Sequence, residues 1–65
     1  MKFLQIVAHT TGGEVKSSVE QVTEREYESI KDAMKQSLEY IEFNTETGWV
    51  VIPGNQIIYM EIVLQ

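Results

Sequence analysis

The hydrophobic and polar positions at the start of the chain repeat with a period of two. Residues 2–9 alternate as a β-strand does, although both of the faces they define are rather apolar. Gly12 and Gly13 tolerate the positive φ of a hairpin turn, and residues 15–20 then alternate again. The pattern therefore predicts a strand, a turn and a second, half-exposed strand.

The period changes to that of a helix at Thr23. Residues 23–26 read T-E-R-E, a capping box in which the Thr23 hydroxyl accepts from the Glu26 amide and the Glu26 carboxylate accepts from the Thr23 amide. We expect the helix to begin at Glu24 and to end within residues 36–38. Apolar and small residues then recur on one stripe, which we expect to be buried. This stripe comprises Tyr27, Ile30, Ala33, Met34, Ser37 and Leu38.

A period of two returns in the second half of the chain. Residues 40–44 alternate, residues 45–48 read as a turn, and residues 49–52 form a β-branched and aromatic run. Residues 53–55, P-G-N, interrupt the pattern because proline cannot donate to a β-ladder. Residues 57–64 are expected to form the last strand. The second half thus predicts a hairpin followed by one more strand.

Together these elements predict an α+β protein with the order β-β-α-β-β-β in a single domain, residues 1–65. The expected architecture is one small antiparallel sheet with the helix packed on one face. The last strand has Glu61 as its one polar side chain, so both of its faces are apolar. Because one helix covers only one face, either the sheet curls into a small SH3-like barrel or another chain covers its second face.

Residues on the uncovered face are the candidates for an interaction surface. For Trp49 a core position is favoured and an interface is the alternative, whereas for Tyr59 the two interpretations are balanced. The candidate interaction residues are Phe3, Val7, Trp49, Ile57, Tyr59 and Val63.

Composition strengthens the expectation of association. The chain has 65 residues and no cysteine, so disulfides are absent, and it offers no His/Cys cluster for a structural zinc. Chains this short usually need such a device or a partner subunit. The net charge of −5 disfavours binding to nucleic-acid phosphates and to anionic membranes, and no stretch approaches the ~20 apolar residues of a membrane span. Absence of cysteine fits a reducing compartment, and a cytoplasmic location is expected.

Three groups of residues are of types that could carry chemistry, and a structural interpretation is preferred for each. His9 has no recognisable nucleophile or orienting partner at a useful spacing, so a surface histidine at a hairpin end is expected. The glycine pair leads into a strand rather than the helix that a phosphate loop requires. The helical acids Glu24, Glu28 and Asp32 interleave with lysines, as on a solvated face. We expect no enzyme activity, no cofactor and no metal.

A short stretch, Ile52 to Ile57, joins two strands through a tight interruption and resembles the end of small SH3-like or Sm-like barrels. The mid-chain helix departs from those folds, and the chain as a whole is not assigned to a family. No function is carried over from the resemblance. Small acidic proteins of this type also resemble products of phage and mobile-element genomes.

The sequence does not determine a function, but it favours one class of function. The first expectation is a non-enzymatic module that forms homo-oligomers through the second face of its sheet, with continuation of the sheet across chains as one way to do so. The alternative is a monomeric acidic regulator or inhibitor, of the phage type, that binds a basic site on another protein. A small-ligand binder or enzyme around His9 comes last.

Overall fold

The computed structural model describes all residues from Met1 to Gln65. Its fold is α+β, with strands that pair antiparallel and one α-helix, as the sequence predicts. The elements follow in the order β1 (Lys2–Thr10), β2 (Gly13–Lys16), β3 (Glu20–Val22), α1 (Glu24–Met34), β4 (Tyr40–Thr45), β5 (Gly48–Pro53), a 3-10 turn η1 (Gly54–Gln56) and β6 (Ile57–Leu64).

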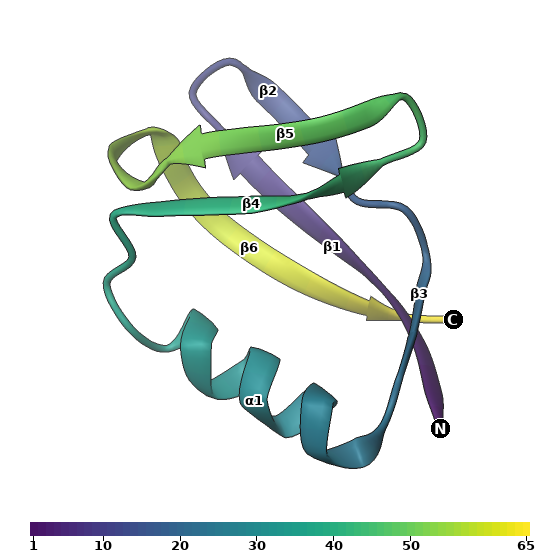
Figure 1. The fold of residues 1–65 in the computed structure, drawn as a ribbon. Coiled ribbons are helices and arrows are strands. Elements are labelled where there is room, and N and C mark those ends of the chain that lie inside the picture. Colours follow the sequence, from purple (N-terminus) through teal and green to yellow (C-terminus); the bar gives the residue numbers. More distant parts are fainter.

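The strands form two sheets, whereas one was expected. In the four-stranded main sheet, β1 lies at the centre, with β2 and β3 along one side and β6 along the other. Strands β4 and β5 form a separate two-stranded hairpin. Figure 1 shows this hairpin crossing the main sheet at an angle, with α1 below it. The two sheets do not close into a barrel, so barrel closure does not account for the surplus apolar surface.

The predicted second strand is broken into β2 and β3. Between them Ser17 is buried, its amide donates to the carbonyl of Ile6 (2.8 Å), and its hydroxyl accepts from the Ile6 amide (2.8 Å). The amide of Ser18 donates instead to the carbonyl of Asn44 in β4 (2.9 Å). The break therefore connects the main sheet to the hairpin, and Ser17 is a structural residue rather than an edge serine in solvent.

The helix begins as the capping box predicts and ends earlier than expected. The Thr23 hydroxyl accepts from the Glu26 amide (3.1 Å), and the Glu26 carboxylate accepts from the Thr23 amide (2.9 Å). The last helical residue is Met34, two residues short of the predicted range. No residue of α1 is fully buried, and Ala33 on the predicted stripe is exposed. The helix is therefore only partly covered.

The core lies between the main sheet and the hairpin. Its centre is Ala8 from β1, Phe43 from β4 and Ile52 from β5, all less than 10% exposed. Partly buried residues from five strands surround this centre: Ile6, Val15, Ile41, Val50, Ile57 and Met60. Leu4 and Val22 are buried on neighbouring strands at the β3 end of the main sheet. We call this side of the main sheet its inner face.

One glycine is required where the hairpin leads into β6. The amide of Gly54 donates to the carbonyl of Glu39 (2.7 Å), which holds η1 against the start of β4. A Cβ atom at Gly54 would lie 2.0 Å from the carbonyl oxygen of Leu38. Only glycine lets the two backbone segments approach this closely.

Candidate interaction surfaces

The six candidate interaction residues do not share one surface. Phe3, Tyr59 and Val63 are exposed on the main sheet, whereas Trp49 is on the separate hairpin. Val7 is 5% exposed, so it offers no contact area to a partner. Ile57 is half-buried and packs against the core. Half of the candidate set therefore lies on the expected face as accessible surface.

A β-bulge explains the position of Ile57. His9 pairs with Tyr59, but the next residue of β1, Thr10, pairs with Ile57, so Ile58 is the extra residue in β6. An extra residue reverses which face the side chains before it occupy. Ile57 consequently packs inward and Ile58 is 67% exposed, the reverse of the simple alternation.

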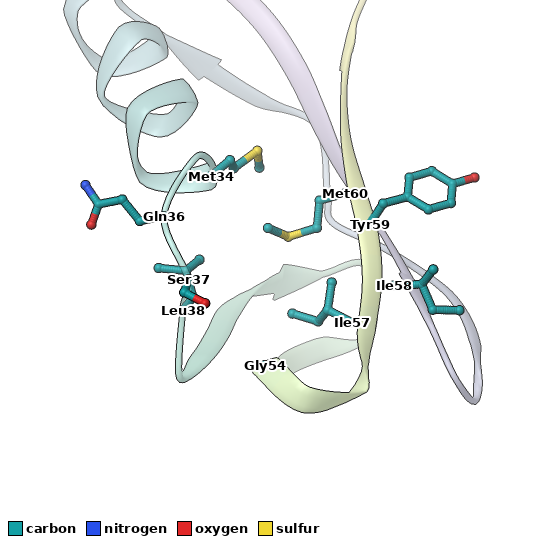
Figure 2. A pocket seen from close by; sticks show the side chains of 9 residues that line it. All are labelled: Met34, Gln36, Ser37, Leu38, Gly54, Ile57, Ile58, Tyr59 and Met60. Carbon is teal, nitrogen blue, oxygen red and sulfur yellow. The ribbon is translucent and has the colours of Figure 1, made fainter.

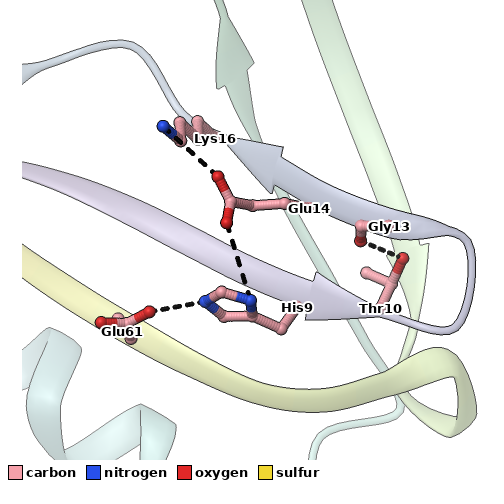
Figure 3. Close-up of polar contacts among 6 residues, drawn as sticks. All are labelled: His9, Thr10, Gly13, Glu14, Lys16 and Glu61. Atoms are coloured by element: carbon pink, nitrogen blue, oxygen red, sulfur yellow. Dashed lines mark hydrogen bonds and ion pairs between the residues drawn. The ribbon is translucent and has the colours of Figure 1, made fainter.

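The centre of the exposed face of the main sheet, which we call the main-sheet outer face, is polar. His9 Nε2 lies 2.5 Å from Glu61 on β6, and His9 Nδ1 lies 3.8 Å from Glu14 on β2. Glu14 also contacts the amino group of Lys16 at 3.3 Å. Figure 3 shows this chain of contacts running across three strands, from Lys16 through His9 to Glu61. The ring of Tyr59 stacks on His9, with the centroids 4.1 Å apart.

Val7 is buried beside this polar cluster. Val7 is paired with Lys16 on one side and with Glu61 on the other, so both long side chains flank it on the same face. Their aliphatic stems can cover an apolar neighbour while the charged ends stay in water. The main-sheet outer face is thus covered at its centre by its own side chains.

The exposed face of the hairpin, which we call the hairpin outer face, carries two aromatic rings and one carboxylate. Its residues are Tyr40, Glu42, Asn44, Trp49, Val51 and Pro53, all exposed and paired across the two strands. Trp49 is 57% exposed and its indole N–H donates to Glu42 (3.3 Å). A core position for Trp49 is therefore wrong. The alternation of residues 40–44 and the strand predicted at residues 49–52 indicated most of this face, whereas Pro53 was assigned to the interruption after it.

The outer side of β6, which we call the β6 edge, has no strand partner. Gln65 N–H donates to the Phe3 carbonyl (2.9 Å), and backbone bonds in an antiparallel pair engage every second residue. Tyr59, Glu61 and Val63 therefore bond to β1. The amides and carbonyls of the alternate residues point away from β1 to the β6 edge. These alternate residues are Met60, Ile62 and Leu64.

A cleft of about 270 Å³ lies between the end of α1 and β6, and six of its nine lining residues are hydrophobic. Met34 and Leu38 line it from the helical side, and Ile57 and Met60 line it from β6. Figure 2 shows the side chains of Met34 and Met60 directed into the space between the two elements, while Tyr59 and Ile58 point to the opposite side of β6. Methionine side chains adapt readily to different apolar partners.

The remaining constellations have structural roles. Glu28 pairs with Lys31 and Asp32 pairs with Lys35 along exposed α1. Gly13 has a φ of 121° and forms the turn into β2. No cluster of three or more His, Asp or Glu side chains is arranged to hold a metal ion. Helix α1 is neither long nor apolar enough to cross a membrane.

Comparison with known protein families, with curated proteins and with solved structures found no match to this chain.

Proposed function

We propose that the chain is a non-enzymatic protein-interaction module that forms a homodimer by pairing the β6 edges of two copies. The unpaired β6 edge carries this proposal. An exposed, long and apolar edge strand presents a row of free amides and carbonyls, and it pairs with another strand unless charges, proline or a cover prevent it. β6 spans eight residues, contains no proline and has Glu61 as its one charged residue.

The sequence of β6 fits pairing with itself. A two-fold axis at Ile62 places Met60 opposite Leu64 of the second copy, so that apolar residues meet on the inner face. The same register places Glu61 opposite Val63. A register centred on Glu61 would instead set two carboxylates directly opposite each other, which is destabilising. The charge on β6 thus favours one register.

The cleft beside β6 also supports the proposal. In the register centred on Ile62, Leu64 of the second copy comes next to Met60, which lines the cleft. Leu64 is 51% exposed in a single copy. Its transfer from water to the neighbourhood of Met60 and Met34 would stabilise the dimer by the hydrophobic effect.

The His9 cluster favours a binding role over a catalytic one. Both ring nitrogens of His9 face carboxylates, and one ring face is covered by Tyr59. No serine, threonine or lysine nucleophile contacts the ring. A general base needs a free nitrogen within reach of the proton that it removes.

Light scattering behind size exclusion, over a hundredfold range of concentration, tests the proposal. The expected mass rises with concentration from 7.5 kDa toward twice that value. Leu64→Pro removes one amide from the β6 edge and no bond to β1, so it should leave the protein monomeric with unchanged helix content in circular dichroism.

The variant Val63→Lys distinguishes a dimer formed by pairing of two β6 edges from a dimer formed by packing of two main-sheet outer faces. In the register centred on Ile62 the new lysine stands opposite Glu61 of the second copy, so the dimer should persist or become tighter. Packing of two outer faces would be broken by the same charge. A mass of 7.5 kDa at every concentration, or an unchanged dimer in the Leu64→Pro variant, would contradict the proposal.

A further inference from the structure

The second half of the chain carries acids but no lysine, arginine or histidine. Residues 36–65 contain Glu39, Glu42, Glu46 and Glu61, and their last preceding cation is Lys35. Glu61 is paired with His9 in the main sheet. The other three glutamates have no cation within 4 Å. They lie just before β4, within it and in the turn after it.

The hairpin carries two exposed aromatic residues, Tyr40 on the strand of Glu42 and Trp49 on the partner strand. Trp49 is 57% exposed and Tyr40 is 54% exposed, at opposite ends of the hairpin outer face. Between them Val51 is 54% exposed and pairs with Glu42. Exposed aromatic side chains beside a carboxylate that has no cationic partner are suited to binding a partner molecule.

We propose that the hairpin outer face binds a basic, extended segment of a partner protein, with one arginine or lysine side chain held by the Trp49 ring and the Glu42 carboxylate. The inference is independent of the proposed dimer, because it concerns the other sheet.

The geometry at Trp49 supplies two of the contacts that a cation requires. The indole N–H donates to Glu42 Oε2 at 3.3 Å, which fixes the carboxylate beside the ring. Glu42 Oε1 has no partner in the chain and can accept from a guanidinium or ammonium group. The face of a tryptophan ring attracts a cation through its quadrupole, and it is the best of the aromatic side chains at doing so.

Charge decides between possible occupants of the hairpin outer face. A second copy would bring its own Glu42, on a chain of net charge −5, toward the same carboxylate, and like charges in an interface cost binding energy. Nucleic acid and anionic lipid would meet the same repulsion. Lys16 lines a polar hollow together with Glu46 but forms its ion pair with Glu14. A basic partner is therefore the occupant that the surface complements.

The test uses a fluorescein-labelled peptide of alternating arginine and valine and measures its anisotropy against unlabelled protein. We expect saturable binding that weakens with salt, and quenching of Trp49, the one tryptophan of the chain. Trp49→Ala should weaken binding at least about tenfold, as loss of a central aromatic contact does. Glu42→Gln should weaken it about threefold.

Glu28→Gln is the matched control for Glu42→Gln. It removes the same charge from exposed α1, where Glu28 pairs with Lys31, and it should leave peptide binding unchanged. Leu64→Pro should also bind the peptide normally. The proposal would be overturned by no binding, by equal weakening in Glu28→Gln and Glu42→Gln, or by equal affinity for a peptide with glutamine in place of arginine. Loss of the dimer in Trp49→Ala would identify a second copy as the occupant and would also overturn it.

Discussion

The main-sheet outer face and the hairpin outer face are both built from alternating strand residues. They differ in whether their charged side chains form ion pairs. On the main sheet, Glu14 and Glu61 are paired with His9, and Lys16 completes the cluster. On the hairpin, Glu42 contacts only the indole N–H of Trp49. The first face satisfies its charges internally, whereas the second leaves negative charge and aromatic surface exposed.

This difference assigns separate roles to the surfaces of the molecule. The main-sheet outer face covers its own apolar centre, and its exposed apolar residues are divided by the His9 cluster. The hairpin outer face carries the carboxylate of Glu42 and no cation, so a second copy does not complement it by charge. The β6 edge remains as the surface suited to self-pairing, and the hairpin outer face as the surface suited to a foreign, basic partner.

The largest expected difference between the two faces is in the free energy of unfolding lost when one valine on each face is replaced by alanine. Val7→Ala should lower the free energy of unfolding by about 2 kcal/mol, because it removes two methyl groups from a buried site. Val51→Ala, at a site that is 54% exposed, should cost about 0.5 kcal/mol or less. For a domain of this size, thermal unfolding should show a drop of about 10 °C for the first variant and a small one for the second. Equal losses of free energy of unfolding in the two variants would mean that Val7 and Val51 are buried to the same extent.

Replacing one glutamate on each face by glutamine should give a smaller difference in the free energy of unfolding. Glu61→Gln removes the partner of His9 and should destabilise the fold by about 0.5 kcal/mol, since the pair is half exposed to solvent. Glu42→Gln removes a charge without a cationic partner from a chain of net charge −5, so stability should stay constant or rise slightly. Urea unfolding at low and high salt measures both. A larger loss of free energy of unfolding for Glu42→Gln than for Glu61→Gln would contradict this difference between the two faces.

The smallest effect is expected for Trp49→Ala. The side chain is 57% exposed, so its removal should change the free energy of unfolding by no more than about 0.5 kcal/mol. Its effect should fall instead on peptide binding. A loss of several kcal/mol would show that the indole is part of the core, as the sequence had favoured.

Local signals in the sequence were sufficient for several elements. The T-E-R-E motif predicted the cap and the start of α1, and the glycine pair predicted the turn into β2, because both depend on residues only a few positions apart. The alternation of residues 40–44 likewise placed Tyr40 and Glu42 on one face. Such features are fixed by backbone geometry and do not require knowledge of the tertiary fold.

Features that depend on distant contacts escaped prediction. The bulge at Ile58 arises from the pairing of β6 with β1, and it reversed the expected faces of Ile57 and Ile58. Val7 is buried between Lys16 and Glu61, two residues distant in sequence that pair with it from the neighbouring strands. The break at Ser17 depends on the amide of Ser18 reaching β4. Predicting each of these features requires the register between strands, which the hydrophobic periodicity of the sequence does not specify.

Amide hydrogen exchange along β6 tests dimerisation through the β6 edge most directly. In a dilute sample, the amides of Glu61 and Val63, which bond to β1, should exchange slowly, and those of Ile62 and Leu64 should exchange fast. At a hundredfold higher concentration, Ile62 and Leu64 should become protected as well, because they then bond to the second copy. Rapid exchange of these two amides in a sample whose mass has doubled would contradict pairing through the β6 edge.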